Sequence, residues 1–135
     1  MIGILLLTQG HIGKAMIEAA EHMLGSKIPK LNALTANGSE SSEKFLQTFQ
    51  RELNSLDEGQ GVLILADIYG ASHTNMVQAF LKKDRIEMIA GTNLPMLIRV
   101  LNYRNLALEE LAEKAFAGGN SGIVRSIIKS ATNGN

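Results

Sequence analysis

Four short apolar runs, each followed by a stretch with helical periodicity, constrain the fold of this chain more than any other feature. The runs cover residues 2–7, 28–34, 62–65 and 86–91. Pro29 interrupts the second run, which is therefore the weakest. A further helix is expected over residues 108–116, where apolar residues again share one helical face. Strands that alternate with helices in this way indicate an α/β domain with a parallel sheet and right-handed crossovers.

The length of 135 residues is typical of one domain, which we place at residues 1–128. The Gly-Gly-Asn sequence at residues 118–120 is expected to end the last helix. Residues 121–128 then suit a short final strand, and residues 129–135 a flexible tail.

Composition excludes several classes of function. Lys plus Arg and Asp plus Glu both number 13, so a formal net charge of zero gives no indication of binding to nucleic acid or to an anionic membrane. The absence of cysteine excludes disulfides and thiolate chemistry. The apolar run at residues 2–7 is too short to cross a bilayer and has no basic leader, so we expect no membrane insertion and a cytoplasmic location.

Polar or glycine-containing turns follow three of the expected strands, at residues 8–11, 67–75 and 92–95. Because the carboxyl ends of parallel strands lie at one edge of a sheet, these turns should converge there, where open α/β sheets bind ligands. The central turn places Asp67 and two hydroxyl side chains beside a helix start, whose backbone N–H groups suit an anion. A tight turn capped by Asp67 explains this stretch, taken alone, equally well.

The three turns carry ordered motifs: Thr8-Gln9-Gly10, then Asp-Ile-Tyr-Gly-Ala-Ser-His-Thr-Asn at 67–75, then Gly-Thr-Asn-Leu-Pro-Met-Leu at 91–97. They resemble the enzyme IIA domain of the mannose/fructose/sorbose class of the bacterial phosphoenolpyruvate-dependent sugar phosphotransferase system. The family pattern has Thr-His-Gly in the first motif and Pro at the position of His73 in the second. The resemblance covers residues 1–127.

This resemblance implies a doubly wound, mainly parallel four-stranded sheet flanked by helices, and homodimers that exchange a C-terminal strand. It also implies a histidine that accepts a phosphoryl group from the phosphocarrier protein and passes it to an enzyme IIB domain. The central aspartate, here Asp67, would hold the other ring nitrogen of that histidine. Phosphate-binding positions would be Gly70, Ala71, Ser72 and His73. Supporting positions would be Thr8, Gly10, His11, Tyr69, Asn75 and Asn93. No cofactor or metal is implied.

Gln9 stands where the family has the phosphorylated histidine. A carboxamide nitrogen is not a nucleophile at neutral pH, so transfer through this position is expected to be disabled. We expect the Gln9 carboxamide to donate to Asp67 instead, and Gln9→His to restore phosphoryl acceptance. His11 reads as an exposed helix-start residue and His73 as a turn residue in the place of proline; either is also a possible relocated acceptor.

Two functions therefore stay open. In the first, the protein is a sugar phosphotransferase IIA component that relays phosphoryl groups, and Gln9 is an engineered replacement. In the second, it is a natural paralogue that docks the same partners or regulates without being phosphorylated. An unrelated hydrolase or reductase ranks last, because the nucleophile-elbow, Walker and dinucleotide motifs are all absent.

Overall fold

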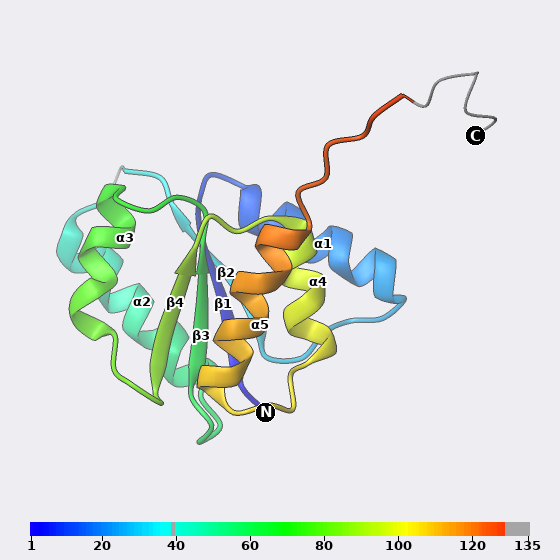
Figure 1. Cartoon of the computed structure of the whole chain (residues 1–135). Helices are drawn as coiled ribbons and strands as arrows, with labels where there is room; N and C mark the ends of the chain where they lie inside the picture. Colours follow the sequence, from blue (N-terminus) through cyan, green and yellow to red (C-terminus); the bar gives the residue numbers. More distant parts are fainter. Residues whose placement is uncertain (39, 129–135) are drawn as a thin grey trace.

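The computed structural model describes residues 1–38 and 40–128. Its centre is a four-stranded sheet with the order β2-β1-β3-β4, in which every neighbouring pair is parallel (Figure 1). The strands are β1 (Gly3–Gln9), β2 (Leu31–Ala36), β3 (Val62–Ala66) and β4 (Ile86–Ala90). The helices are α1 (Ile12–Leu24), α2 (Ser42–Leu56), α3 (Ser72–Val77), the 3-10 turn η1 (Gln78–Phe80), α4 (Leu94–Asn102) and α5 (Leu108–Ser121). The expected α/β fold with a four-stranded parallel sheet is confirmed.

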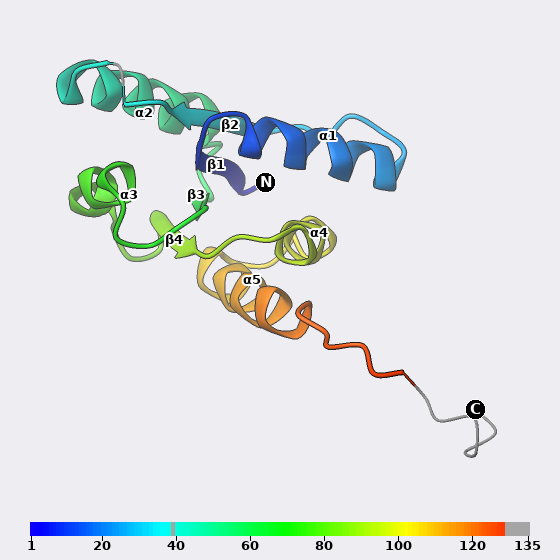
Figure 2. The same cartoon turned by 90° about the horizontal axis from the view of Figure 1, so that it is seen from above.

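Helices cover both faces of the sheet, as Figure 2 shows from above. Successive residues of a strand point to opposite faces, so Leu6 of β1 packs with α1, α4 and α5, whereas Leu5 and Leu7 pack with α2 and α3. The central strands β1 and β3 are buried on both faces, which explains why they appear in the sequence as unbroken apolar runs. None of the helices in the described residues is both long and apolar enough to cross a bilayer.

Two element boundaries differ from the sequence-based expectation. Strand β2 begins at Leu31 instead of residue 28, because Pro29 has no N–H to donate and Lys30 has a positive φ of 51°. The helical pattern after residue 75, with Met76, Val77, Phe80 and Leu81 on one face, predicts a third helix that reaches Leu81. In the structure α3 ends at Val77, and Leu81 follows η1 in an extended conformation.

The expectation for Gly118 and Gly119 was wrong. Helix α5 continues through both glycines to Ser121, and both are buried. A Cβ atom on Gly118 would lie 2.6 Å from Cβ of Arg99, and one on Gly119 would lie 2.6 Å from Cε of Met96. The glycines therefore allow α5 to lie close against α4, and they do not end the helix.

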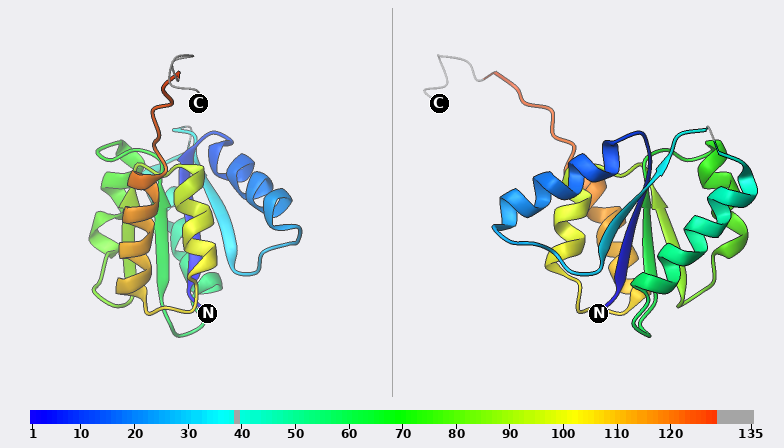
Figure 3. Two further views of the ribbon diagram at one scale, coloured as in Figure 1. Left: turned by 45° about the vertical axis from the view of Figure 1, so that its right-hand side comes forward. Right: turned by 180° about the vertical axis from the view of Figure 1, so that it is seen from behind.

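The expected final strand is also absent from the described residues. Residues 123–128 have no regular secondary structure and lead away from the body of the molecule (Figure 3). We call residues 122–128 the C-terminal arm. Its apolar side chains are exposed, up to 97% at Ile128. The expected flexible tail at 129–135 lies outside the described residues.

Candidate functional site

The carboxyl ends of β1 and β3 bring Gln9 and Asp67 together. The two strands are neighbours in the sheet, with Leu7 opposite Ala66. The ladder continues one step further, where the Asp67 N–H donates to the Leu7 carbonyl at 3.2 Å. Gln9 ends β1 and Asp67 directly follows β3, so residues 58 positions apart in sequence meet at this edge.

The Asp67 carboxylate accepts three hydrogen bonds, each of 2.8 Å. Oδ2 accepts from the backbone N–H of Gln9, and Oδ1 accepts from the backbone N–H of Ile68 and from Nε2 of His73. An ionised carboxylate only accepts hydrogen bonds, so Nε2 of His73 carries the proton. The His73 side chain is 3% exposed and that of Asp67 is 13% exposed. His73 therefore places a buried imidazole against this aspartate.

This geometry corrects the expected contact between Gln9 and Asp67. Gln9 does donate to the carboxylate, but through its main chain, and its side chain is exposed. Because three other donors already satisfy Asp67, the carboxamide has no role there. His73 is likewise more than a turn residue, since its ring is buried against a charged partner.

Opposing effects act on the pKa of Asp67. Burial of the carboxyl raises its pKa, but the hydrogen bonds from the Gln9 N–H, the His73 ring and the Ile68 N–H together lower it by more. The net result is a pKa below the ordinary aspartate value. Asp67 is therefore ionised at neutral pH, and its charge stabilises the loop that joins β3 to α3.

We expect Asp67→Asn to lower the free energy of unfolding at pH 7 by about 2 kcal/mol, because it replaces charge-assisted hydrogen bonds with neutral ones. The folded-state pKa lies below the unfolded value of about 3.9, so this stabilisation is complete above that value and is lost as the pH falls through the folded pKa. Urea unfolding followed by circular dichroism between pH 3 and 8 should show the difference shrinking in acid. Glu113→Gln on the exposed face of α5 is the matched control. A difference that stays constant down to pH 3 would contradict this assignment.

A small pocket of about 70 Å³ opens beside this pair of side chains, and Gln9, Ser72 and His73 line it. The remaining lining residues are Ala36, Asn37, Gly38, Glu40, Phe45 and Met76. The pocket is far smaller than the roughly 300–1,000 Å³ of typical small-molecule sites, so it suits a single group and not a whole sugar.

Sequence reasoning missed the contribution of the loop after β2. In that loop Ser41 caps α2 by accepting from the Lys44 N–H. Because β2 lies next to β1, the loop also brings Glu40 to the pocket. The strand order was the missing signal, since it decides which loops share an edge.

Several predicted site residues hold the surrounding loops in place. Thr8 is buried and accepts from the Gly13 N–H at 2.8 Å, at the start of α1. Asn93 caps α4 by accepting from the Met96 N–H, and it donates to the Gly119 carbonyl. Asn75 donates to the Gly70 carbonyl at 3.2 Å. These three side chains shape the edge of the sheet without lining the pocket.

The other predicted positions lie in the turns after β1 and β3. Gly10 and Gly70 have positive φ values of 49° and 84°, which favour glycine in these turns. His11 is exposed at the start of α1, as expected, and its side chain makes no capping bond. Ala71 precedes the first residue of α3, so Asp67 is not the cap of that helix.

Three apolar side chains in and beside the turns after β1 and β3 are exposed. Tyr69 is 73% exposed, and Ile68 and Ile12 are also exposed. Within the described residues, no three His, Asp or Glu side chains lie close enough together to hold a metal ion. The site therefore combines a largely buried carboxylate–imidazole pair with a small pocket, and exposed apolar side chains lie in the adjoining turns, which is an arrangement suited to a protein partner.

An open α/β domain with these three motifs at the carboxyl edge of its sheet defines a class of phosphotransferase-system domains. The family model EIIA-man, described as "PTS system fructose IIA component", matches residues 3–116. The chain belongs to this family, and the resemblance seen in its motifs is confirmed.

Curated relatives agree with this assignment, and a solved structure shares the fold. The chain is 30% identical over 125 residues to the PTS system mannose-specific EIIAB component of Escherichia coli K12, covering 90% of this chain and 38% of that protein. It is 31% identical over 113 residues to the PTS system fructose-specific EIIA component of Bacillus subtilis 168, covering 82% and 77%. The fold is similar to the phosphotransferase system component EIIA of Streptococcus agalactiae, with a TM-score of 0.81, 22% identity and coverage of 93% and 97%.

Proposed function

We propose that this chain is a IIA-family module that docks phosphotransferase-system partners in the cytoplasm without carrying a phosphoryl group at position 9. The observation that supports this is the pairing of two departures from the family pattern. Gln9 removes the nucleophile, and the His73 ring donates to Asp67 in the place of the missing imidazole.

The two departures compensate for each other. Loss of the histidine alone would remove one donor from a carboxylate that is only 13% exposed, and an unmatched buried charge is costly. His73 supplies that donor, so the fold keeps a satisfied Asp67 while the chemistry is lost. A single engineered replacement at position 9 does not account for His73, and this favours the non-phosphorylated paralogue over a disabled relay.

The relay function has one observation in its favour. A ring oriented by a carboxylate is the arrangement that a phosphoryl acceptor needs, so transfer from the phosphocarrier protein to an enzyme IIB domain through His73 is the second candidate. The near-complete burial of His73 argues against it, because the phosphate donor is itself a protein and cannot reach a ring that is 3% exposed.

A binding measurement distinguishes a module that docks phosphotransferase-system partners from a protein with an unrelated function. We expect calorimetry to show binding of the wild-type chain to the unphosphorylated phosphocarrier protein or to an enzyme IIB domain from the same source. Tyr69→Ser in the turn between β3 and α3 should weaken this binding by about tenfold or more, because exposed aromatic residues often dominate such interfaces. Tyr103→Ser at the end of α4 is the matched control and should have no effect. Absence of binding to both partners would contradict the proposal.

The proposal includes a homodimer. Strand β4 is at the edge of the sheet, and within the described residues its outer side is paired only at Ile86, through a bridge to Lys82. A groove of about 430 Å³ lies beside it, and the arm exposes its apolar side chains to solvent. An open strand edge and an apolar arm are both aggregation hazards, and addition of the arm to β4 of a second copy covers both.

Light scattering at about 10 μM should therefore give the mass of a dimer, and deletion of residues 122–135 should give a monomer. Deletion of residues 129–135 alone is the control and should leave the dimer intact. A monomeric full-length chain would contradict the homodimer without affecting the docking proposal.

A further inference from the structure

The small pocket at the carboxyl edge of the sheet combines apolar walls with a single acidic side chain. Phe45 and Met76 are among the apolar lining residues, Glu40 is the one acidic lining residue, and no Lys or Arg lines the pocket. The walls come from the end of β1, the loop after β2, α2 and α3 (Figure 1). A carboxylate without a basic neighbour gives a pocket a negative potential, which favours a cation over an anion.

The Glu40 carboxylate has no partner among the described residues. It is partly buried and forms neither an ion pair nor a hydrogen bond with them. Lys44, four positions further along the chain, is exposed and does not line the pocket. Among the lining residues only His73 could carry a positive charge, and its ring is held by the ionised Asp67 at 2.8 Å. A cation bound in the pocket would therefore offset the cost of withdrawing the Glu40 charge from water.

The polar side chains of the pocket match an ammonium group. Glu40 offers a carboxylate, Gln9 a carboxamide oxygen and Ser72 a hydroxyl oxygen. A protonated lysine side chain has three N–H donors and no acceptor, so three acceptors can meet three donors. The apolar surface of Phe45 and Met76 suits the methylene groups behind the ammonium. A volume of about 70 Å³ suits the end of one such side chain.

We propose that this pocket binds a lysine side chain of a protein partner, with Glu40 as its counter-ion and Gln9 and Ser72 as further acceptors. The inference rests on the proposed docking function for the identity of the partner. A protein supplies the lysine because the turn that leads into α3 exposes Ile68 and Tyr69, so a partner that covers this turn also reaches the pocket. Gln9 then has a binding role at the position where the family carries its phosphoryl group.

n-Butylammonium chloride, the end of a lysine side chain, tests the pocket without any partner. In an NMR titration it should shift the backbone amides of Ser72 and His73 of the wild-type chain saturably, and sodium phosphate at the same ionic strength should not. Glu40→Gln should weaken n-butylammonium binding by about tenfold. Glu43→Gln, exposed in the first turn of α2, is the matched control and should bind like the wild type. No saturable shift, or equal affinity of Glu40→Gln and the wild type, would overturn the inference.

Double-mutant cycles with the partner identify the lysine. Calorimetry uses the phosphocarrier protein or the enzyme IIB domain, whichever binds the wild-type chain, with its surface lysines changed to glutamine one at a time. One of these changes should weaken binding to the wild type by about tenfold and have no further effect on binding to Glu40→Gln. Coupling of Glu40 to no lysine of the partner would overturn the inference and leave the docking proposal intact.

The two experiments keep the proposals apart. If n-butylammonium binds the wild-type chain more tightly than Glu40→Gln while neither protein partner binds, docking to these partners is wrong and the preference of the pocket for an ammonium group is supported. If a partner binds but n-butylammonium does not, docking is supported and the lysine pocket is wrong.

Discussion

Gln9→His alone should accept phosphate slowly, whereas Gln9→His combined with His73→Pro should accept it about 10- to 100-fold faster. In the transfer, a P–N bond forms at the new imidazole as the P–N bond to the phosphocarrier histidine breaks, and the departing imidazole takes up a proton. The new ring needs a carboxylate to hold its second nitrogen. Oδ1 of Asp67 is already engaged by His73 at 2.8 Å, so only the double variant frees it. The sequence alone predicted that Gln9→His would suffice, and the geometry changes that expectation.

Initial rates of labelling from radioactive phosphoenolpyruvate, with enzyme I and the phosphocarrier protein present, measure this effect. Gln9→Asn combined with His73→Pro is the matched control, since it frees the carboxylate without supplying an imidazole and should stay unlabelled. A Gln9→His variant that is labelled as fast as the double variant would show that His73 does not compete for Asp67.

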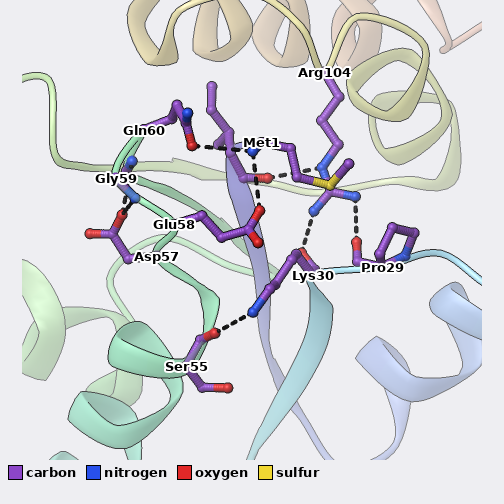
Figure 4. A network of polar contacts seen from close by, with 11 residues as sticks. Met1, Pro29, Lys30, Ser55, Asp57, Glu58, Gly59, Gln60 and Arg104 are labelled. Atoms are coloured by element: carbon purple, nitrogen blue, oxygen red, sulfur yellow. Dashed lines mark hydrogen bonds and ion pairs between the residues drawn. The ribbon is translucent and has the colours of Figure 1, made fainter.

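Arg104→Met should lower the free energy of unfolding by about 3 kcal/mol, because it removes three hydrogen bonds from a charged donor, one of them to the buried Ile2 carbonyl. Arg104 lies at the edge of the sheet opposite the pocket and is 8% exposed. Its guanidinium donates to the carbonyls of Ile2 at 2.9 Å and Pro29 at 2.6 Å, and also to that of Lys30 (Figure 4). It thereby ties the loop after α4 to the starts of β1 and β2.

Urea unfolding at pH 7 measures this loss. Arg51→Met on α2 removes the same functional group from an exposed position, where its partner is the Thr48 hydroxyl, and should change stability by less than about 0.5 kcal/mol. Equal effects of the two substitutions would show that the three carbonyl contacts do not stabilise the fold.

Much of the fold followed from the sequence because its signals are local. Apolar runs and helical periodicity predicted all four strands and the order of the elements. The prediction for Gly118 and Gly119 was wrong because two glycines near a helix end look the same in sequence in both cases. They can end the helix, or they can let it pack closely against a neighbouring helix. Only the approach of α4, which leaves no room for a Cβ atom, decides between these roles.

The site was predictable in outline and not in its contacts. The parallel-sheet rule correctly placed Gln9, Asp67 and His73 at one edge. It gave no information about side-chain direction, so it did not reveal that His73 turns its ring onto Asp67 while the Gln9 side chain is exposed and lines the pocket. The direction of the His73 ring depends on where α3 begins. A six-residue helix has too little helical periodicity in its sequence for its first residue to be predicted.

The most direct test of the proposed function is phosphopeptide mapping of the wild-type chain after incubation with labelled phosphoenolpyruvate, enzyme I and the phosphocarrier protein. A relative with the family's Thr-His-Gly motif, included in the same reaction, shows that the relay is active. We predict that this relative is labelled and that Gln9, His11 and His73 of this chain are not. Stoichiometric label on His73 or His11 would contradict the account and would make the protein a phosphoryl carrier with a relocated acceptor.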